Sequence, residues 1–174
     1  YIDSHALLLT DEEVAYLHAT DPMRIAGAIP ACSAQRVAGL VGATEREQQL
    51  FLADAIMDSS ARQRALLFLM LVLQEGRIDV LSYLMELDGG LDSYQLKEEF
   101  PFISIGSTEH SFRAGEFSIE IVLHAFQPYL REIAATCGSD DAGRMALRVA
   151  HALLEQQMYE RAVQVIIELC SPYQ

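Results

Sequence analysis

Positively charged side chains are scarce in this sequence of 174 residues, which has 12 lysines and arginines against 25 aspartates and glutamates. The formal net charge is therefore −13 at pH 7. Because nucleic-acid binding requires Lys and Arg to neutralise phosphates, we expect no nucleic-acid partner. An anionic membrane surface repels such a chain for the same reason.

Cysteines and long apolar runs are also scarce. The three cysteines, at positions 32, 137 and 170, are odd in number and widely spaced, which excludes the disulfide framework of a small secreted domain. The longest apolar run, Ala65–Leu73, has nine residues, about half the length of a bilayer span. No signal peptide is visible, and the chain starts at Tyr1 without a Met. We therefore expect residues 1–174 to form one helical domain excised from a longer chain.

The composition nevertheless favours a folded protein. Hydrophobic residues make up 51% of the chain, enough apolar surface to offset the entropy lost on ordering. Eleven of the twelve basic residues are Arg, and there are 22 alanines. This usage is typical of GC-rich genomes and favours a bacterial origin.

Helix signals recur along most of the chain. Capping-box patterns occur at Thr10–Glu13 and Thr44–Glu47, and Asp21-Pro22 and Ser33 mark two further helix starts. Apolar periodicity predicts helices over residues 45–58, 61–74, 78–87, 118–136, 141–156 and 158–170. Residues 61–74 are apolar on nearly all sides, which predicts a central helix. The predicted fold is all-α, a compact bundle or a short solenoid of stacked helical hairpins.

Breaker residues predict where these helices end. We expect Gly76 to provide a left-handed C-cap for residues 61–74, and Gly89-Gly90 to end the next helix. Pro128 should kink or divide residues 118–136. Asp140, after the turn at Cys137, is the expected N-cap of the last helical hairpin.

Three segments resemble known helical arrays. Residues 76–85 resemble the middle of an ankyrin repeat, with a Gly turn before the helix, although the Thr-Pro-Leu-His opening is absent. Residues 146–169 resemble a tetratricopeptide-type hairpin, with Ala150, Tyr159 and Ala162 at its small and aromatic positions. Residues 21–41 resemble the short-helix arrays of flagellar motor-switch and magnesium-transporter domains. The three disagree on a repeat length, so together they imply stacked helical hairpins and no single family.

The segment 100–117 interrupts the helical pattern. It contains Pro101, Gly106 and Gly115, and its alternation at residues 102–105 predicts a long loop or a short β-like excursion. Seven acidic and two basic residues precede it between positions 75 and 99. The loop either covers the core, which we favour, or offers aromatic anchors beside an acidic rim. The residues predicted to contact a partner in the second case are Phe100, Phe102, Ile105, His110, Phe112 and Phe117.

Catalytic and metal-binding motifs are hard to find. The five histidines lack the spacing of metal ligands, so we expect no metal and no cofactor. Cys137 lies in a predicted turn before a helix, where a thiol pKa can be lowered, and it is the one candidate nucleophile. The cysteine-dependent ubiquitin ligases among bacterial effectors use a Cys-x-Asp loop. Here the Asp is three positions on, at Asp140, and Asp141 beside it opposes a thiolate.

These observations favour a non-catalytic protein–protein interaction domain of a bacterial protein. It would be a secreted effector or secretion-system component that binds a basic or amphipathic partner, in the cytoplasm or in a host cytoplasm. One alternative is the catalytic domain of an effector enzyme such as a ubiquitin ligase. Another is an acidic secretion chaperone or immunity protein, whose binding would weaken strongly with salt. The sequence leaves the oligomeric state open.

Overall fold

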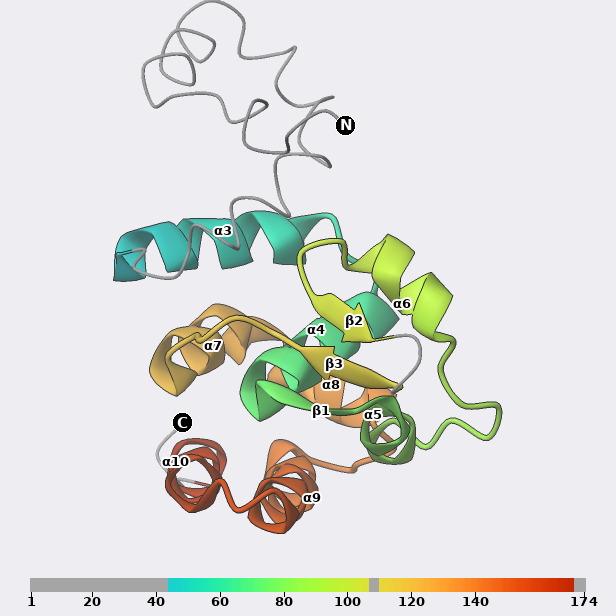
Figure 1. Ribbon diagram of the computed structural model, residues 1–174. Coiled ribbons are helices and arrows are strands. Elements are labelled where there is room, and N and C mark those ends of the chain that lie inside the picture. The colour runs from blue at the N-terminus through green and yellow to red at the C-terminus, as the bar shows by residue number, and fades with distance from the viewer. Residues whose placement is uncertain (1–43, 107–109, 171–174) are drawn as a thin grey trace, which may run out of the picture.

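The computed structural model describes residues 44–106 and 110–170, which fold into helices and one small sheet (Figure 1). The predicted helix starts at Thr10–Glu13, Asp21-Pro22 and Ser33, and Cys32, lie outside these residues. The elements, in chain order, are α3 (Glu45–Met57), α4 (Ala61–Leu73), β1 (Glu75–Arg77), α5 (Ile78–Leu84), α6 (Ser93–Glu99), β2 (Ser104–Gly106), β3 (Ser111–Arg113), α7 (Ile119–Phe126), the 3-10 helix η2 (Gln127–Tyr129), α8 (Leu130–Thr136), α9 (Ala142–Glu155) and α10 (Tyr159–Leu169). The mostly helical prediction is confirmed, whereas the sheet departs from an all-α class.

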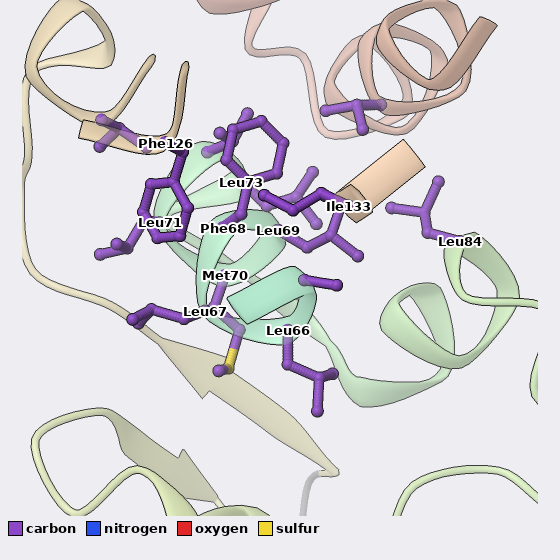
Figure 2. Packing of buried hydrophobic residues seen from close by; sticks show 14 of the residues in the cluster. Leu66, Leu67, Phe68, Leu69, Met70, Leu71, Leu73, Leu84, Phe126 and Ile133 are labelled. Carbon is purple, nitrogen blue, oxygen red and sulfur yellow. The ribbon is translucent and has the colours of Figure 1, made fainter. Parts of the chain in front are cut away.

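Helix α4 is the centre of the hydrophobic core. Every residue from Ala65 to Leu73 is buried, as its uninterrupted apolar sequence predicts. Figure 2 shows its side chains surrounded by residues of other helices, among them Leu84 of α5, Phe126 of α7 and Ile133 of α8. The rings of Phe68 and Phe126 meet edge to face with centroids 5.4 Å apart. Helices α5, α7, α8 and α9 and strand β1 thus pack around α4.

Capping boxes start both α3 and α4. At the start of α3 the Thr44 hydroxyl accepts from the Glu47 backbone N–H, and the Glu47 carboxylate accepts from the Thr44 backbone N–H, as predicted. Ser60 and Gln63 do the same for α4. The predicted C-cap at Gly76 is wrong, because α4 already ends at Leu73 and Gln74, at φ 65°, makes the turn. Gly76 lies in β1, where an added Cβ would be 2.7 Å from the Gln156 Nε2 atom.

The segment between α6 and α7 forms two strands rather than an irregular loop. Strand β3 is central and antiparallel to both neighbours, so the strand order is β1-β3-β2. Gly76 of β1 and Ile105 of β2 both lie opposite Phe112 of β3. The β-like excursion predicted within residues 100–117 is therefore confirmed, and β1 completes the sheet from a distant part of the chain.

The remaining elements follow the predicted periodicity with shifted ends. Pro128 lies in η2 and divides residues 118–136 into α7 and α8. Asp141, not Asp140, caps α9, and its carboxylate accepts from the Arg144 N–H at 2.8 Å. Helix α5 ends at Leu84, three residues earlier than predicted. Helix α6 was not predicted; its N-cap is Asp92.

Candidate partner-binding surface

Most of the side chains predicted as partner anchors lie in the core. Phe100, Ile105, Phe112 and Phe117 are buried, and Phe102 is half-buried. Only His110 is exposed. The segment 100–117 therefore covers the core, as the favoured interpretation expects, and its aromatic rings do not face a partner in this structure.

An aromatic cluster explains why these rings turn inward. Phe102 meets Phe51 of α3 edge to face at 5.1 Å and Phe100 at 6.1 Å. Phe117 lies 6.2 Å from Phe51. Ring pairs at these distances contribute about 0.5–1.5 kcal/mol each beyond the area they bury. The cluster joins α3 to both ends of the segment. Its rings contact one another within the domain, so they are not free to act as anchors for a partner.

Exposed tyrosines lie instead on α5 and α6. The apolar residues Ile78, Leu81 and Leu84 place one face of α5 against the core, which leaves Tyr83 on the other face, 71% exposed. Helix α6 buries Leu96 and leaves Tyr94 70% exposed. In Figure 1 α5, α6 and their connection all lie on the right of the molecule.

We call the exposed residues of this region the α5–α6 surface. Its members are polar, and most are carboxylates: Asp79, Tyr83, Glu86, Asp88, Asp92, Tyr94, Lys97 and Glu98. The acidic stretch was recognised in the sequence, but the two tyrosines within it were not. The spacing of the apolar residues in the two short helices could have indicated them. The buried Ile and Leu positions of α5, and the buried Ser and Leu positions of α6, leave Tyr83 and Tyr94 on the outward faces.

Arg148 of α9 attaches α5 to the rest of the molecule. Its Nη2 donates to the Tyr83 carbonyl at 2.9 Å, and its Nη1 donates to the Cys137 carbonyl at 2.6 Å. The same Nη1 lies 3.1 Å from the Glu86 carboxylate. The guanidinium also lies over the Tyr83 ring, 5.7 Å from its centre. These contacts fix the end of α5 and the backbone that carries Tyr83.

A hollow of about 360 Å³ opens beside Tyr83. Its lining combines aromatic, acidic and basic groups: Ser82, Tyr83, Glu86, Leu87, Asp88 and Arg148. Because the donors of Arg148 are directed to backbone carbonyls and to Glu86, its charge offsets one carboxylate and leaves the Asp88 carboxylate at the hollow. The hollow thus has an aromatic wall and an anionic edge.

Backbone strain occurs beside this hollow. Glu86 has φ 52°, a left-handed conformation that costs a non-glycine residue on the order of 1–2 kcal/mol. Gly138 has φ 63°, and an added Cβ there would overlap the Glu86 carboxylate. The Glu86 carboxylate can therefore lie against the turn after α8 because Gly138 has no side chain.

Cys137 does not have the properties of a nucleophile. Its side chain is buried, and this burial raises the pKa of the thiol to about 11, opposed in part by the nearby Arg148 charge. At neutral pH the sulfur is protonated and out of contact with solvent. The structure does not favour the alternative of a cysteine-dependent ubiquitin ligase.

Neither a metal site nor a membrane-spanning helix occurs within residues 44–106 and 110–170. In these ranges no group of three or more His, Cys, Asp or Glu side chains is arranged to hold a metal ion. No helix within them has the length and apolar character needed to cross a membrane. The chain matches no protein-family model, no curated protein and no solved structure.

Proposed function

We propose that this chain is a non-catalytic protein–protein interaction domain whose α5–α6 surface binds a basic segment of another protein. The observation that carries the proposal is the exposure of Tyr83 and Tyr94, each about 70%, among carboxylates. Arginine side chains stack on tyrosine rings and pair with carboxylates, so one partner residue can use both kinds of group. Exposed aromatic anchors are frequent hot spots of protein interfaces.

The hollow beside Tyr83 supports an arginine as the anchoring residue of the partner. A guanidinium placed there meets the part of the Tyr83 ring that Arg148 does not cover, and the Asp88 carboxylate at the edge. The net charge of −13 adds a long-range attraction that speeds encounter with a basic partner. This attraction is screened by salt over about 8–10 Å, so binding should weaken as salt increases.

The broader setting is part of the same proposal. The α9–α10 hairpin supports an architecture of stacked helical hairpins. The Arg-rich and Ala-rich composition supports a bacterial origin. In this proposal the protein is a secreted effector or a secretion-system component. Its place would be the cytoplasm, or a host cytoplasm after delivery.

Binding of a short, unstructured peptide of arginine, glycine and serine tests the proposal. We expect fluorescence anisotropy to detect binding to the full chain at low salt. The Tyr83→Ala/Tyr94→Ala double variant should bind at least about ten-fold more weakly, as for loss of two hot-spot residues. Asp88→Asn/Glu98→Gln should weaken binding by a smaller factor.

A charge-matched control separates this surface from net charge. Glu116→Gln/Glu120→Gln removes two exposed carboxylates in the segment before α7 and in its first turn, and Figure 1 shows α7 across the molecule from α5 and α6. We expect this variant to bind the arginine peptide within about two-fold of the unmodified chain. Equal losses in the two charge variants, with no effect of the tyrosine substitutions, would assign binding to net charge and refute the proposal.

A further inference from the structure

The outward face of the α9–α10 hairpin is apolar. Leu147 and Leu154 on α9, and Tyr159, Val163 and Ile167 on α10, are between 45% and 60% exposed. On α9 the two leucines are seven residues apart, and on α10 the three residues repeat every four. Both spacings place side chains in a stripe along one side of a helix.

The two stripes adjoin each other. Cys170 continues the α10 stripe three residues after Ile167, and Gly143 continues the α9 stripe four residues before Leu147. The Cys170 thiol lies 3.8 Å from the Gly143 carbonyl oxygen, so the stripes meet at this end of the hairpin. We call the continuous apolar region the hairpin face. Its extent along α10, from Tyr159 to Ile167, is about 12 Å at 1.5 Å per residue.

The hairpin face is separate from the face that packs on the core. Met145, Val149 and Leu153 of α9, with Ala162 and Val165 of α10, are buried on the opposite side. Figure 1 shows α9 and α10 side by side as the lowest layer of the molecule. The hairpin therefore has two apolar faces, and residues 44–106 and 110–170 cover only one of them. Contiguous apolar patches of a few hundred Å² on a protein surface are commonly interaction sites.

Charged residues around the hairpin face define what fits on it. Asp140 and Asp141 precede α9, Glu155 ends it, and Glu160 lies in the first turn of α10. Among the arginines of the hairpin, Arg148 and Arg161 are directed toward the core, which leaves Arg144 as the exposed one. A second copy of this chain would bring the same acidic residues together, at a cost in like-charge repulsion.

We propose that the hairpin face binds an amphipathic helix with one aliphatic stripe and basic flanks. The groove between two antiparallel helices accepts a third helix, whose side chains at i, i+3, i+4 and i+7 pack between the two stripes. Lysines and arginines beside that stripe then meet Glu155, Glu160 and Asp141, whereas Asp140 already pairs with Arg144. The occupant is a folded helix of a partner, unlike the extended basic segment assigned to the α5–α6 surface.

A designed peptide tests the assignment directly. The probe is a synthetic helix with leucines at i, i+3, i+4 and i+7 and arginine or lysine on its flanks. We expect it to bind the full chain, whereas a peptide of the same composition in scrambled order, and one with glutamate flanks, should each bind at least about ten-fold more weakly. Equal binding of all three peptides would overturn the proposal.

Paired variants locate the site. Leu147→Ser/Ile167→Ser removes two exposed side chains of the hairpin face and should weaken binding of the helix at least about ten-fold. Leu50→Ser/Met57→Ser removes two comparably exposed side chains of α3 and should leave binding within about two-fold. Circular dichroism verifies folding, and Val163→Ser alone serves if the first double variant unfolds. If the two double variants weakened binding of the helical peptide equally, the hairpin face would not be the binding site.

Two further outcomes are decisive. Tyr83→Ala/Tyr94→Ala should leave binding of the helical peptide unchanged, so this inference and the proposed function can fail separately. Sedimentation of the full chain should show no self-association that depends on Leu147 and Ile167. A dimer that the Leu147→Ser/Ile167→Ser variant dissociates, with no binding of the helical peptide, would assign the hairpin face to a second copy and overturn the proposal.

Discussion

The α5–α6 surface and the hairpin face both belong to helices packed on the core, and beneath each of them one arginine points inward. The contacts of these two arginines differ. Arg148 is 24% exposed, pairs with a carboxylate and reaches the carbonyls of Tyr83 and Cys137. Arg161 of α10 donates to Val72 O at 2.5 Å, Leu71 O at 2.8 Å and Phe117 O at 3.3 Å. Its burial lowers the pKa of the guanidinium to about 10, which still leaves it charged at neutral pH.

This difference indicates that Arg161 binds carbonyls at the centre of the core, whereas Arg148 binds carbonyls at the end of α5 and just after α8. Arg161 supplies donors to the last carbonyls of α4, which the helix itself leaves unpaired. Arg148 holds α5 through a partly solvated contact that water can replace in part. We therefore expect substitution of Arg161 to lower the free energy of unfolding of the whole domain. Substitution of Arg148 should mainly increase local opening of α5.

The largest expected effect is that of Arg161→Met. Removing the guanidinium leaves three carbonyls of buried residues without these donors, which we expect to cost about 3 kcal/mol or more in the free energy of unfolding. Urea denaturation followed by circular dichroism measures this change. Arg161→Lys should be intermediate, because one ammonium cannot reach all three oxygens in the planar geometry of a guanidinium. A loss below about 1 kcal/mol for Arg161→Met would remove the distinction between the two arginines.

The second effect is that of Arg148→Met, which we expect to cost about 2 kcal/mol. Hydrogen exchange should then increase in α5 more than in α4, because the lost bonds fix the end of α5. The matched control is Arg144→Met on the same helix, whose exposed ion pair with Asp140 should contribute less than about 1 kcal/mol. Faster exchange spread evenly over the whole core would contradict a local role for Arg148.

The smallest effect is the pH dependence of stability that arises from the Cys137 thiol, which lies near Arg148. The Cys137 thiol has its pKa raised from 9.0 to about 11 by burial, so the unfolded chain loses this proton first as pH rises. Stability should be fully present below pH 9 and should fall between pH 9 and 11, by about 1 kcal/mol at pH 10. Denaturation at several pH values measures this slope, and Cys137→Ala should flatten it. An identical slope in the variant would show that other groups cause the decline.

Local sequence patterns predicted the long helices well, for identifiable reasons. Helix α4 combines an apolar run with a start signal, and the α9–α10 hairpin has strong apolar periodicity. Helix α6 was missed because it spans seven residues and buries only Ser93 and Leu96. The sheet required the pairing of Gly76 with Phe112, and contacts between such distant residues leave no local signal.

The candidate sites show the same limit. The acidic stretch before residue 100 was visible in the sequence, but which aromatic residues are exposed depended on tertiary packing. Phe102 and Phe117 both pack against Phe51 of α3. The sequence around Phe102 and Phe117 gives no indication of this contact with a distant residue. The direction of Arg144, Arg148 and Arg161 was also unpredictable, because all three lie on amphipathic helices and only distant carbonyls distinguish them.

The hydrogen bonds of Arg161 can form only late in the synthesis of the chain. This residue follows Leu71, whose carbonyl it binds, by 90 positions in the chain. At about 5–20 residues per second, translation delivers the arginine roughly 5–20 s after the end of α4. During that interval α4 lacks the Arg161 donors for its Leu71 and Val72 carbonyls. A chain that ends before residue 161 lacks these bonds, and we expect it to be less stable than the full chain.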